Sequence, residues 1–357
     1  MDEINIGSRK LGSEQSTYVI AEMSGNHNQE FDTAVHIMRA AKDCGADAVK
    51  LQTYTPDTIT IDCNNPEFRI GGGTLWDGKT LYDLYGEAYT PWDWQPKLKA
   101  EADRIGIHLF STPFDFTAID LLESMGVPAY KIASFEMVDF PLIERVAKTG
   151  KPIIMSTGMC TEAEIDEALQ VARGAGAHDI VLLKCTSEYP APPEHMNLRT
   201  IPWMRDRFQV PVGLSDHTLG IAAPIAAVAL GACVIEKHFT LSRSEPGPDS
   251  AFSLEPAEFK AMVDAVRTAE KALGKTELGS NPDENKSRIF RRSLYVVRDI
   301  KAGERFTPEN VRSIRPGLGL HTRHLKNIVS RTAAMDIQRG TPMKWEFVEG
   351  APLKDSK

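Results

Sequence analysis

The sequence predicts a (β/α)8 barrel followed by a small β-rich domain, and three observations predict it. Short apolar segments rich in β-branched residues alternate with longer helical patterns through most of the 357 residues. Eight such strand–helix units fit within about 250 residues, the usual length of a closed parallel barrel. A polar segment then precedes a C-terminal region of short strands and turns. A doubly wound open sheet is the alternative that the same alternation allows.

The predicted strands are short apolar runs with polar residues near their ends. They are residues 18–24, 48–54, 108–114, 129–135, 152–158, 180–187, 210–216 and 233–239. Among the helical patterns between them, residues 161–176 begin with Thr161, carry Glu164 three residues later and end in glycine, which is typical of a capped helix. The connection over residues 55–92 is far longer than the others, so it predicts either a substrate cover or a plain surface excursion.

Changes in composition and in the predicted secondary structure divide the chain into a catalytic domain (1–274), a linker (275–288) and a small domain (289–357). The linker is polar and contains Gly, Asn and Pro. Beyond it, "DIKAGERFTPENV" (299–311) is echoed by "DIQRGTPMKWEFV" (336–348). This weak internal repeat predicts a pseudo-symmetric unit with little core of its own.

Composition limits the classes of function. A formal net charge of -8 argues against nucleic acid or an anionic membrane as the main partner, although local lysines could still bind an anionic substrate. The five cysteines are scattered and form no CxxC pair, which favours a reduced, cytoplasmic protein. The N-terminus lacks the basic and apolar regions of a signal peptide, and no stretch reaches transmembrane length. We therefore expect a soluble, cytoplasmic protein.

Polar residues gather near the ends of the predicted strands, and the ends of parallel barrel strands share one face. Two of them are histidines at equivalent ends of adjacent strands, His217 and His238, which could share a divalent ion. Imidazole and oxygen ligands suit Mn²⁺, Co²⁺, Fe²⁺ or Zn²⁺. Because side chains alternate along a strand, Asp216 and Lys237 should point away from this site.

Lysines and hydroxyls form a second group at the same end. Lys50 and Lys131, with nearby serines and threonines, suit a phosphate and a carboxylate, and no GxxxxGK[ST] loop for a nucleoside triphosphate is present. A strand lysine could instead act as a Schiff-base nucleophile, as in barrel aldolases. Glu22 and Glu136 could orient hydroxyls and move protons, or serve as plain ion-pair partners.

Several motifs together resemble the sialic acid synthase family over nearly the whole chain. They are "AEMSGNH", "VKLQTY", "FSTPF", "YKIASFE", "STGM", "KCTSEYP", "GLSDHT" and "EKHFT". The tail resembles the SAF (antifreeze-like) domain of those enzymes. Within the family, "LQTYTPDTIT" and "GGGTLWDGKTLYDLYGEAYTP" resemble the pseudaminic acid synthases rather than the N-acetylneuraminic acid synthases.

The resemblance implies condensation of phosphoenolpyruvate with 2,4-diacetamido-2,4,6-trideoxy-L-altrose to a nonulosonic acid and phosphate. An N-acetylneuraminate or legionaminate synthase is the alternative within the family. A Schiff-base barrel aldolase is a more distant one, and the tail alone suggests a carbohydrate-binding or ice-binding protein. The product is expected in surface glycans or modified flagellin.

The resemblance also implies roles for individual residues. The catalytic residues would be Glu22, Glu136, His217 and His238, with the two histidines holding a divalent metal: Mn²⁺, or alternatively Mg²⁺ or Co²⁺. The metal would polarise the sugar aldehyde and touch the phosphoenolpyruvate carboxylate. The residues implied for binding phosphoenolpyruvate are Lys50, Thr112, Lys131, Ser134, Ser156 and Ser215. Those implied for the sugar are Gln52, Tyr189, Asp249 and Arg315.

Arg315 lies in the tail, which implies a domain-swapped homodimer in which each active site receives an arginine from the other chain. Two features depart from the N-acetylneuraminate synthases at the expected sugar site. Ser187 stands where asparagine is common, and the long connection carries Trp76 and Tyr82. An aromatic cover suits a 6-deoxy, doubly acylated sugar, which is less polar than N-acetylmannosamine.

Overall fold

The computed structural model describes residues 3–12, 14–245, 247–279 and 281–351. The chain divides into two compact units between Gly274 and Lys275, each with its own hydrophobic core. Residues 1–2 and 352–357, at the outer ends of the two predicted domains, lie outside the described residues. No helix in the described ranges combines the length and the apolar character needed to cross a membrane.

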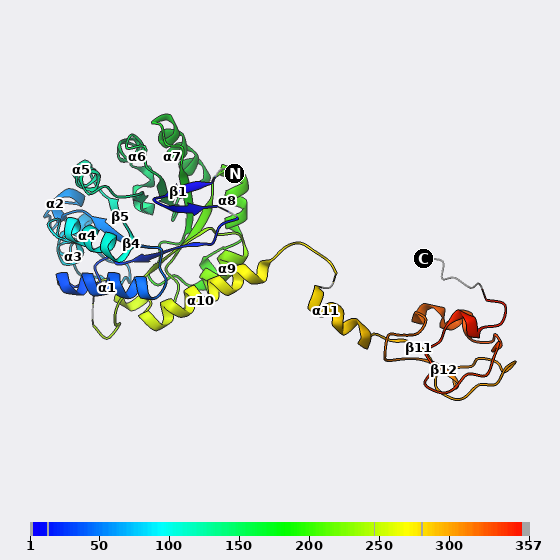
Figure 1. Cartoon of the computed structure of the whole chain (residues 1–357). Helices are drawn as coiled ribbons and strands as arrows, with labels where there is room; N and C mark the ends of the chain where they lie inside the picture. Colours follow the sequence, from blue (N-terminus) through cyan, green and yellow to red (C-terminus); the bar gives the residue numbers. More distant parts are fainter. Residues whose placement is uncertain (1–2, 13, 246, 280, 352–357) are drawn as a thin grey trace. The chain divides into compact units, whose positions relative to one another are not determined.

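The first unit contains a closed barrel of eight parallel strands, ringed by helices (Figure 1), so the predicted fold class is confirmed. Around the barrel the order is β10-β3-β4-β5-β6-β7-β8-β9. The strands are β3 (Tyr18–Glu22), β4 (Ala48–Thr53), β5 (His108–Pro113), β6 (Tyr130–Ile132), β7 (Ile153–Ser156), β8 (Ile180–Cys185), β9 (Val212–Asp216) and β10 (Val234–His238). Their side chains are mostly buried, because helices cover the outside of the sheet while side chains fill its interior.

One helix follows each barrel strand and carries an apolar stripe toward the sheet. These helices are α1 (Phe31–Asp43), α4 (Gln95–Ile105), α5 (Phe116–Ser124), α6 (Phe140–Ala147), α7 (Glu162–Gly174), α8 (Thr200–Phe208), α9 (Ala222–Ala229) and α10 (Pro256–Leu273). Helix α7 begins with the predicted capping box: Thr161 Oγ1 accepts from Glu164 N at 3.3 Å, and Glu164 Oε2 accepts from Thr161 N at 2.7 Å.

The long connection between β4 and α4 contains short helices: α2 (Pro56–Ile59), the 3₁₀ turn η1 (Pro66–Phe68) and α3 (Leu81–Ala88). It packs on the barrel through aromatic contacts, since the ring of Tyr54 lies 5.5 Å from that of Tyr85 on α3. An antiparallel bridge between Arg69 and Thr80 closes residues 69–80 into a hairpin. The connection therefore has regular secondary structure along much of its length, and the hairpin lies at its tip.

Two predicted strands are shorter than expected. The segment 129–135 pairs only over β6, because the chain turns at Ala133 into the 3₁₀ helix η2 (Ser134–Val138). The segment 152–158 leaves the sheet after Ser156, where Thr157 and Gly158 begin the turn toward α7. In both cases the polar residues that follow the strand leave the ladder and line the end of the barrel.

A hairpin at the N-terminus was not predicted. It pairs β1 (Ile4–Ile6) with β2 (Arg9–Leu11) and buries Ile4, Ile6 and Leu11 in the core of the barrel unit. Gly7 makes the turn at φ +56°, and a Cβ at this position would lie 2.8 Å from His108 Nε2. Glycine is required here both for the left-handed backbone and for the close approach to β5.

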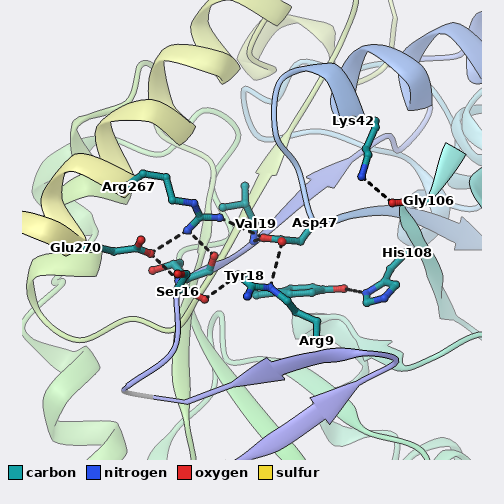
Figure 2. Close-up of polar contacts among 11 residues, drawn as sticks. Arg9, Ser16, Tyr18, Val19, Lys42, Asp47, Gly106, His108, Arg267 and Glu270 are labelled. Carbon is teal, nitrogen blue, oxygen red and sulfur yellow. Dashed lines mark hydrogen bonds and ion pairs between the residues drawn. The ribbon is translucent and has the colours of Figure 1, made fainter.

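A polar network ties this hairpin to the amino ends of the strands (Figure 2). The carboxylate of Asp47 accepts from Val19 N at 2.9 Å and from Arg9 Nε at 3.3 Å, and it also pairs with Arg267 of α10 at 3.4 Å. Arg267 in turn donates to the carbonyl of Thr17 at 2.8 Å. Asp47 thus joins the first strand, the hairpin and the last helix of a barrel that has no free edge.

The second unit is built around the antiparallel strands β11 (Ser293–Val296) and β12 (Val311–Ile314). Its other elements are short: α11 (Pro282–Lys286), η5 (Ser287–Phe290), η6 (Thr322–His324), α12 (Leu325–Ile328) and η7 (Trp345–Phe347). The internal repeat appears directly in the pairing. Ile300 and Ile337, equivalent residues of the two copies, exchange backbone hydrogen bonds of 2.9 and 2.8 Å.

The aspartates of the repeat also exchange contacts. Asp299 Oδ1 accepts from Arg339 N at 2.7 Å, and Asp336 Oδ1 accepts from Ala302 N at 2.8 Å. Each "Asp-Ile" pair therefore caps the turn of the other copy. The small core described by ten buried residues from Leu294 to Val348 completes the unit.

We expect Asp47→Ala to lower the free energy of unfolding of the barrel by about 2 kcal/mol, since one buried backbone donor and two arginines lose their acceptor. The measurement is urea denaturation followed by tryptophan fluorescence, because four of the five tryptophans (76, 92, 94 and 203) lie in this unit. Asp264→Ala, which removes an exposed pair with Lys260, is the control and should change stability by less than about 0.5 kcal/mol. Equal effects of the two substitutions would contradict the assigned role of Asp47.

Candidate active site

The carboxyl ends of the eight parallel strands form one mouth of the barrel. Every site residue predicted from the sequence except Arg315 lies on a barrel strand or in the loop that follows one. They are Glu22, Lys50, Gln52, Thr112, Lys131, Ser134, Glu136, Ser156, Tyr189, Ser215, His217, His238 and Asp249. Contacts link most of these side chains into one continuous polar cluster, described in turn below.

Two buried lysines stand at the centre of the mouth, each near a buried carboxylate. Lys50 Nζ lies 2.6 Å from Glu22 Oε2, and Lys131 Nζ lies 3.6 Å from Glu236 Oε1. Burial opposes the charge of Lys50, but Glu22 and Glu236 together raise its pKa. Burial lowers the pKa of Lys131, and Glu236 offsets this only in part. The two lysines therefore differ in the direction of their pKa shifts, raised for Lys50 and lowered for Lys131.

The pKa values of the carboxyl groups in the mouth shift in different directions, because burial and neighbouring charges act on each to a different extent. Burial raises the pKa of Glu22, since Lys50 compensates only partly, and burial also raises the pKa of Asp249. For Glu236 the positive charges of Lys131 and Lys50 outweigh burial and lower the pKa. Burial raises the pKa of Glu136 to about 7, so this carboxyl can give or take a proton near neutral pH.

Several polar atoms in the mouth are buried but lack a partner. Among the described residues, Glu136 Oε2, Ser156 Oγ, Glu236 Oε2 and His238 Nδ1 are shielded from solvent and make no hydrogen bond. Folded proteins seldom leave such atoms unsatisfied, because each costs free energy. Their concentration at one end of the barrel indicates a site that is completed by a ligand.

Short hydroxyl side chains and one glycine line the side of the mouth near β5, β6 and β7. Lys50 Nζ lies 3.4 Å from Thr112 Oγ1, and Gly158 N donates to Ser134 Oγ at 2.9 Å. A Cβ at Gly158 would collide with Ser187 Oγ and lie 2.8 Å from Ser134 Oγ. Glycine is therefore required here for the close approach of Ser134 and Ser187.

The two predicted histidines face each other, with ring centres 5.4 Å apart. His217 Nδ1 donates to the carbonyl of Thr186 at 2.9 Å, which orients the ring. The ring also hydrogen-bonds with the thiol of Cys185, a contact that a metal at Nε2 would replace. His238 Nδ1 is the unpartnered atom noted above and lies 3.9 Å from Asp249 Oδ2. Burial holds the pKa of His238 well below its usual range, so its imidazole is neutral, as a metal ligand must be. For His217 the thiol of Cys185 and the carbonyl of Thr186 outweigh burial and raise the pKa, so metal binding there would release a proton.

These features fit a divalent metal held by His217 and His238. Among the described residues there is no group of three or more His, Cys, Asp or Glu side chains arranged to bind a metal. Two imidazoles leave coordination positions for substrate oxygens and water, as a Lewis-acid site requires.

An aromatic wall, formed by Trp76, Tyr189 and Phe252, stands beside the histidines. The ring of Tyr189 lies 4.3 Å from that of His217 and 5.8 Å from that of Trp76. Phe252, in the 3₁₀ helix η4 (Ser250–Phe252), lies 4.9 Å from His238. The mouth thus has one half lined by the lysine–carboxylate pairs of Lys50 and Lys131 and an aromatic half at this wall.

A second acidic group links the first strand to the loop after β10. Ser24 Oγ donates to Asp249 Oδ2, and Gln52 Nε2 donates to Glu22 Oε1 at 2.9 Å and to Ser24 Oγ at 3.1 Å. Gln52 and Asp249 therefore meet at Ser24, next to the histidines. Ser24 was placed at this end by the sequence but was given no role.

Asp216 and Lys237 point away from the mouth, as the alternation predicted. They form an ion pair of 2.5 Å in which both side chains are fully buried. Asp216 Oδ1 also accepts from Thr218 N at 3.0 Å. This pair fixes the turn that carries His217 and ties it to the strand that carries His238.

Three sequence expectations have specific outcomes. Arg315 directly follows β12 in the second unit. Tyr82 donates its hydroxyl to Asp57 at 3.1 Å within the long connection, so it does not share the place of Trp76 in the wall. Ser187 lies beside Gly158 and Ser134 as well as Tyr189, and so borders both halves of the mouth.

Sequence reasoning gave no role to Glu236, Phe252 or Cys185. Glu236 shares the inward register of His238, a signal that was available, and it accepts from Ser215 Oγ at 3.0 Å. Burial opposes ionisation of Cys185, but its hydrogen bond with His217 outweighs burial and lowers the pKa of the thiol to about 7. Phe252 follows a turn with no strand pattern, so the sequence offered no signal for it.

Comparison with known proteins gives two matches to family models. Residues 37–278 match the NeuB family, and residues 291–349 match the SAF domain. The pseudaminic acid synthase of Campylobacter jejuni is 46% identical over 334 residues, which cover 94% of this chain and 97% of that protein. The N,N'-diacetyllegionaminic acid synthase of Legionella pneumophila is 38% identical over 349 residues, or 96% of this chain and 98% of that protein.

A solved structure is similar as well. The N-acetylneuraminic acid (sialic acid) synthetase from Leptospira borgpetersenii, crystallised in complex with citrate, has a TM-score of 0.72 and 30% identity. The match covers 80% of this chain and 95% of that one. The resemblance found from the motifs, including that of the tail to a SAF domain, is confirmed.

Proposed function

The chain belongs to the NeuB family, and we propose that it condenses phosphoenolpyruvate with 2,4-diacetamido-2,4,6-trideoxy-L-altrose to form pseudaminic acid and phosphate. The greater identity to a pseudaminic acid synthase than to a legionaminic acid synthase supports this sugar. One structural observation carries the proposal. Buried, unpartnered polar atoms cluster around two buried lysines and a facing pair of histidines, an arrangement suited to an anion and a carbonyl compound together.

In this reaction carbon 3 of phosphoenolpyruvate bonds to the aldehyde carbon of the open-chain sugar. Water adds to carbon 2, and phosphate leaves with the oxygen that joined it to that carbon. Lys50 and Lys131 would bind the anionic groups of phosphoenolpyruvate. The hydroxyls proposed to complete this half of the site are those of Thr112, Ser134, Ser156 and Ser215.

A divalent metal held by His217 and His238, with Mn²⁺ as our first choice and Mg²⁺ or Co²⁺ as alternatives, would polarise the aldehyde. Gln52 and Asp249 both contact Ser24, next to the histidines, and Glu22 accepts from Gln52. These three side chains would orient the sugar's hydroxyl groups. Tyr189 would contact the sugar with its ring face, since this ring lies between His217 and Trp76.

Glu136 is proposed as the acceptor of the proton from the added water. It lies two residues from Ser134 on η2, on the side of the mouth assigned to phosphoenolpyruvate. Its Oε2 is buried and unpartnered, and its pKa of about 7 suits proton transfer.

A Schiff-base aldolase is the second candidate, because the lowered pKa of Lys131 favours a nucleophilic amine. The facing histidines and the hydroxyl-lined pocket favour the metal-dependent condensation. Borohydride treatment with pyruvate would leave a covalent adduct on an aldolase, and our proposal expects none.

We further propose that the enzyme works in the cytoplasm, where its five free cysteines stay reduced, and that its product enters flagellin or surface glycans. A homodimer would complete each site. Apolar side chains around the mouth are more than half exposed, which suits a surface that another subunit covers. They are Phe116, Phe135, Val138, Met159 and Leu219.

We expect His217→Ala and His238→Ala each to reduce turnover at least about 100-fold, because the polarised aldehyde is lost. Chelator should abolish wild-type activity, and Mn²⁺ should restore it. Product is followed by mass spectrometry across a panel of sugars with phosphate release in parallel. His178→Ala, an exposed histidine preceding β8, is the matched control. Equal or better turnover of N-acetylmannosamine by the wild type would overturn the sugar assignment, and full activity in chelator would overturn the metal.

The proton-acceptor role of Glu136 predicts a pH profile. A carboxyl of pKa about 7 is protonated below that pH, so kcat should rise with pH to a plateau above it. In Glu136→Gln this rise should disappear and kcat should be low at every pH. The profile is taken on kcat at saturation, where ionisation of free phosphoenolpyruvate does not contribute. An unchanged rise in the variant would exclude Glu136 as its origin.

The swapped dimer predicts complementation between two inactive variants. Arg315→Ala and His217→Ala chains, carrying different tags, are expressed together. If each barrel uses Arg315 of the partner subunit, a mixed dimer has one intact site, and random pairing leaves about a quarter of all sites intact. Activity of the purified mixed dimer at half the wild-type level is the expected result. No activity above that of the separate variants would contradict the swapped arrangement.

A further inference from the structure

We infer that Trp76 selects the sugar at its carbon 6 end, favouring a methyl group over a hydroxymethyl group. This inference rests on the proposed function, because it assumes that the aldehyde end of a hexose lies at His217 and His238. The hairpin at the tip of the long connection would then contribute to substrate selection through one side chain that lies outside the polar cluster.

The position of Trp76 is fixed by the hairpin that carries it. Trp76 Nε1 donates to the carbonyl of Pro248 at 2.9 Å, which ties the hairpin to the loop after β10. Within the hairpin, Asp77 accepts from Gly73 N at 2.8 Å and from Thr74 N at 2.9 Å. The indole is thus held from both sides, by its own turn and by the residue that precedes Asp249.

The aromatic wall continues from the histidines through Tyr189 to Trp76. The Tyr189 ring lies 4.3 Å from His217, and the Trp76 ring lies a further 5.8 Å from Tyr189. An open-chain hexose spans five carbon–carbon bonds of about 1.5 Å each. With carbon 1 at the histidines, the chain therefore passes Tyr189 and brings its carbon 6 end toward Trp76.

The polar atoms of the wall are already engaged. The indole N–H of Trp76 is used by Pro248, and the hydroxyl of Tyr189 interacts with Ser187. A methyl group at carbon 6 would pack on the ring faces, whereas a hydroxyl there would lose water without gaining a partner. Rejection of an added hydroxyl by an apolar surface is modest, roughly 10- to 100-fold.

On its other side Trp76 borders a surface cavity of about 670 Å³ whose lining includes Lys79, Arg243 and Pro248. Removing the indole would open the wall toward this charged, water-accessible space. A hydroxyl at carbon 6 could then keep its water. The truncated variant should therefore accept both sugars instead of losing affinity for all substrates.

The test compares kcat/KM for the 6-deoxy sugar and for its 6-hydroxy analogue, which differ only at carbon 6. We expect the wild type to prefer the 6-deoxy sugar by roughly 10- to 100-fold and Trp76→Ala to bring the ratio close to one. The KM for phosphoenolpyruvate should stay unchanged. Trp76→Phe, which keeps a ring but not the N–H, should retain most of the preference. Leu75→Ala, a half-exposed neighbour in the same hairpin, is the control and should retain all of it.

The inference is overturned if Trp76→Ala keeps the wild-type ratio, or if the wild type uses both sugars equally well. A raised KM for phosphoenolpyruvate in Trp76→Ala would also contradict it, because the effect would then be a general disturbance of the mouth. Failure of the wild type to use the 6-deoxy sugar at all would contradict the proposed function itself.

Discussion

Charge compensation inside the barrel mouth is the constraint on which the site depends. Lys50 and Lys131 are almost completely removed from water, and an unpaired buried charge costs several kcal/mol. Glu22 and Glu236 offset these charges, yet Glu236 keeps one oxygen unpaired and Lys131 stays 3.6 Å from its partner. The charges of the cluster are therefore offset, but not all of its polar atoms have hydrogen-bond partners. A bound ligand would supply hydrogen-bond partners for these atoms, so binding and folding depend on the same side chains.

The strand order of the closed barrel determines which side chains meet in each part of the mouth. Because all strands are parallel, their polar ends meet, and the order of strands decides which ends are neighbours. β9 and β10 are adjacent, which brings His217 and His238 together. The lysines lie on β4 and β6, and the aromatic wall is formed by the loops after β4, β8 and β10. The facing histidines border both halves of the mouth, since His238 lies 3.9 Å from Asp249 of the polar cluster and both rings contact the aromatic wall.

Much of this could be predicted from the sequence, since apolar runs locate buried strands and polar strand ends locate the mouth. The eight strands and the inward position of His217 and His238 follow from that pattern. The N-terminal hairpin was missed because strands of three residues carry no readable period. The place of Trp76 depends on a hydrogen bond to Pro248, 172 residues away, which no local pattern reveals. The inward position of Glu236 could have been read from the alternation along its strand, but its pairing with Ser215 and Lys131 depends on contacts between strands.

The central claim is that His217 and His238 together hold one divalent metal where the two halves of the mouth meet. Equilibrium dialysis of metal-free protein against Mn²⁺ tests it without reference to activity. The account predicts one Mn²⁺ per chain in the wild type and in His178→Ala, and loss of this binding in both His217→Ala and His238→Ala. Undiminished Mn²⁺ binding by the correctly folded double variant would contradict it.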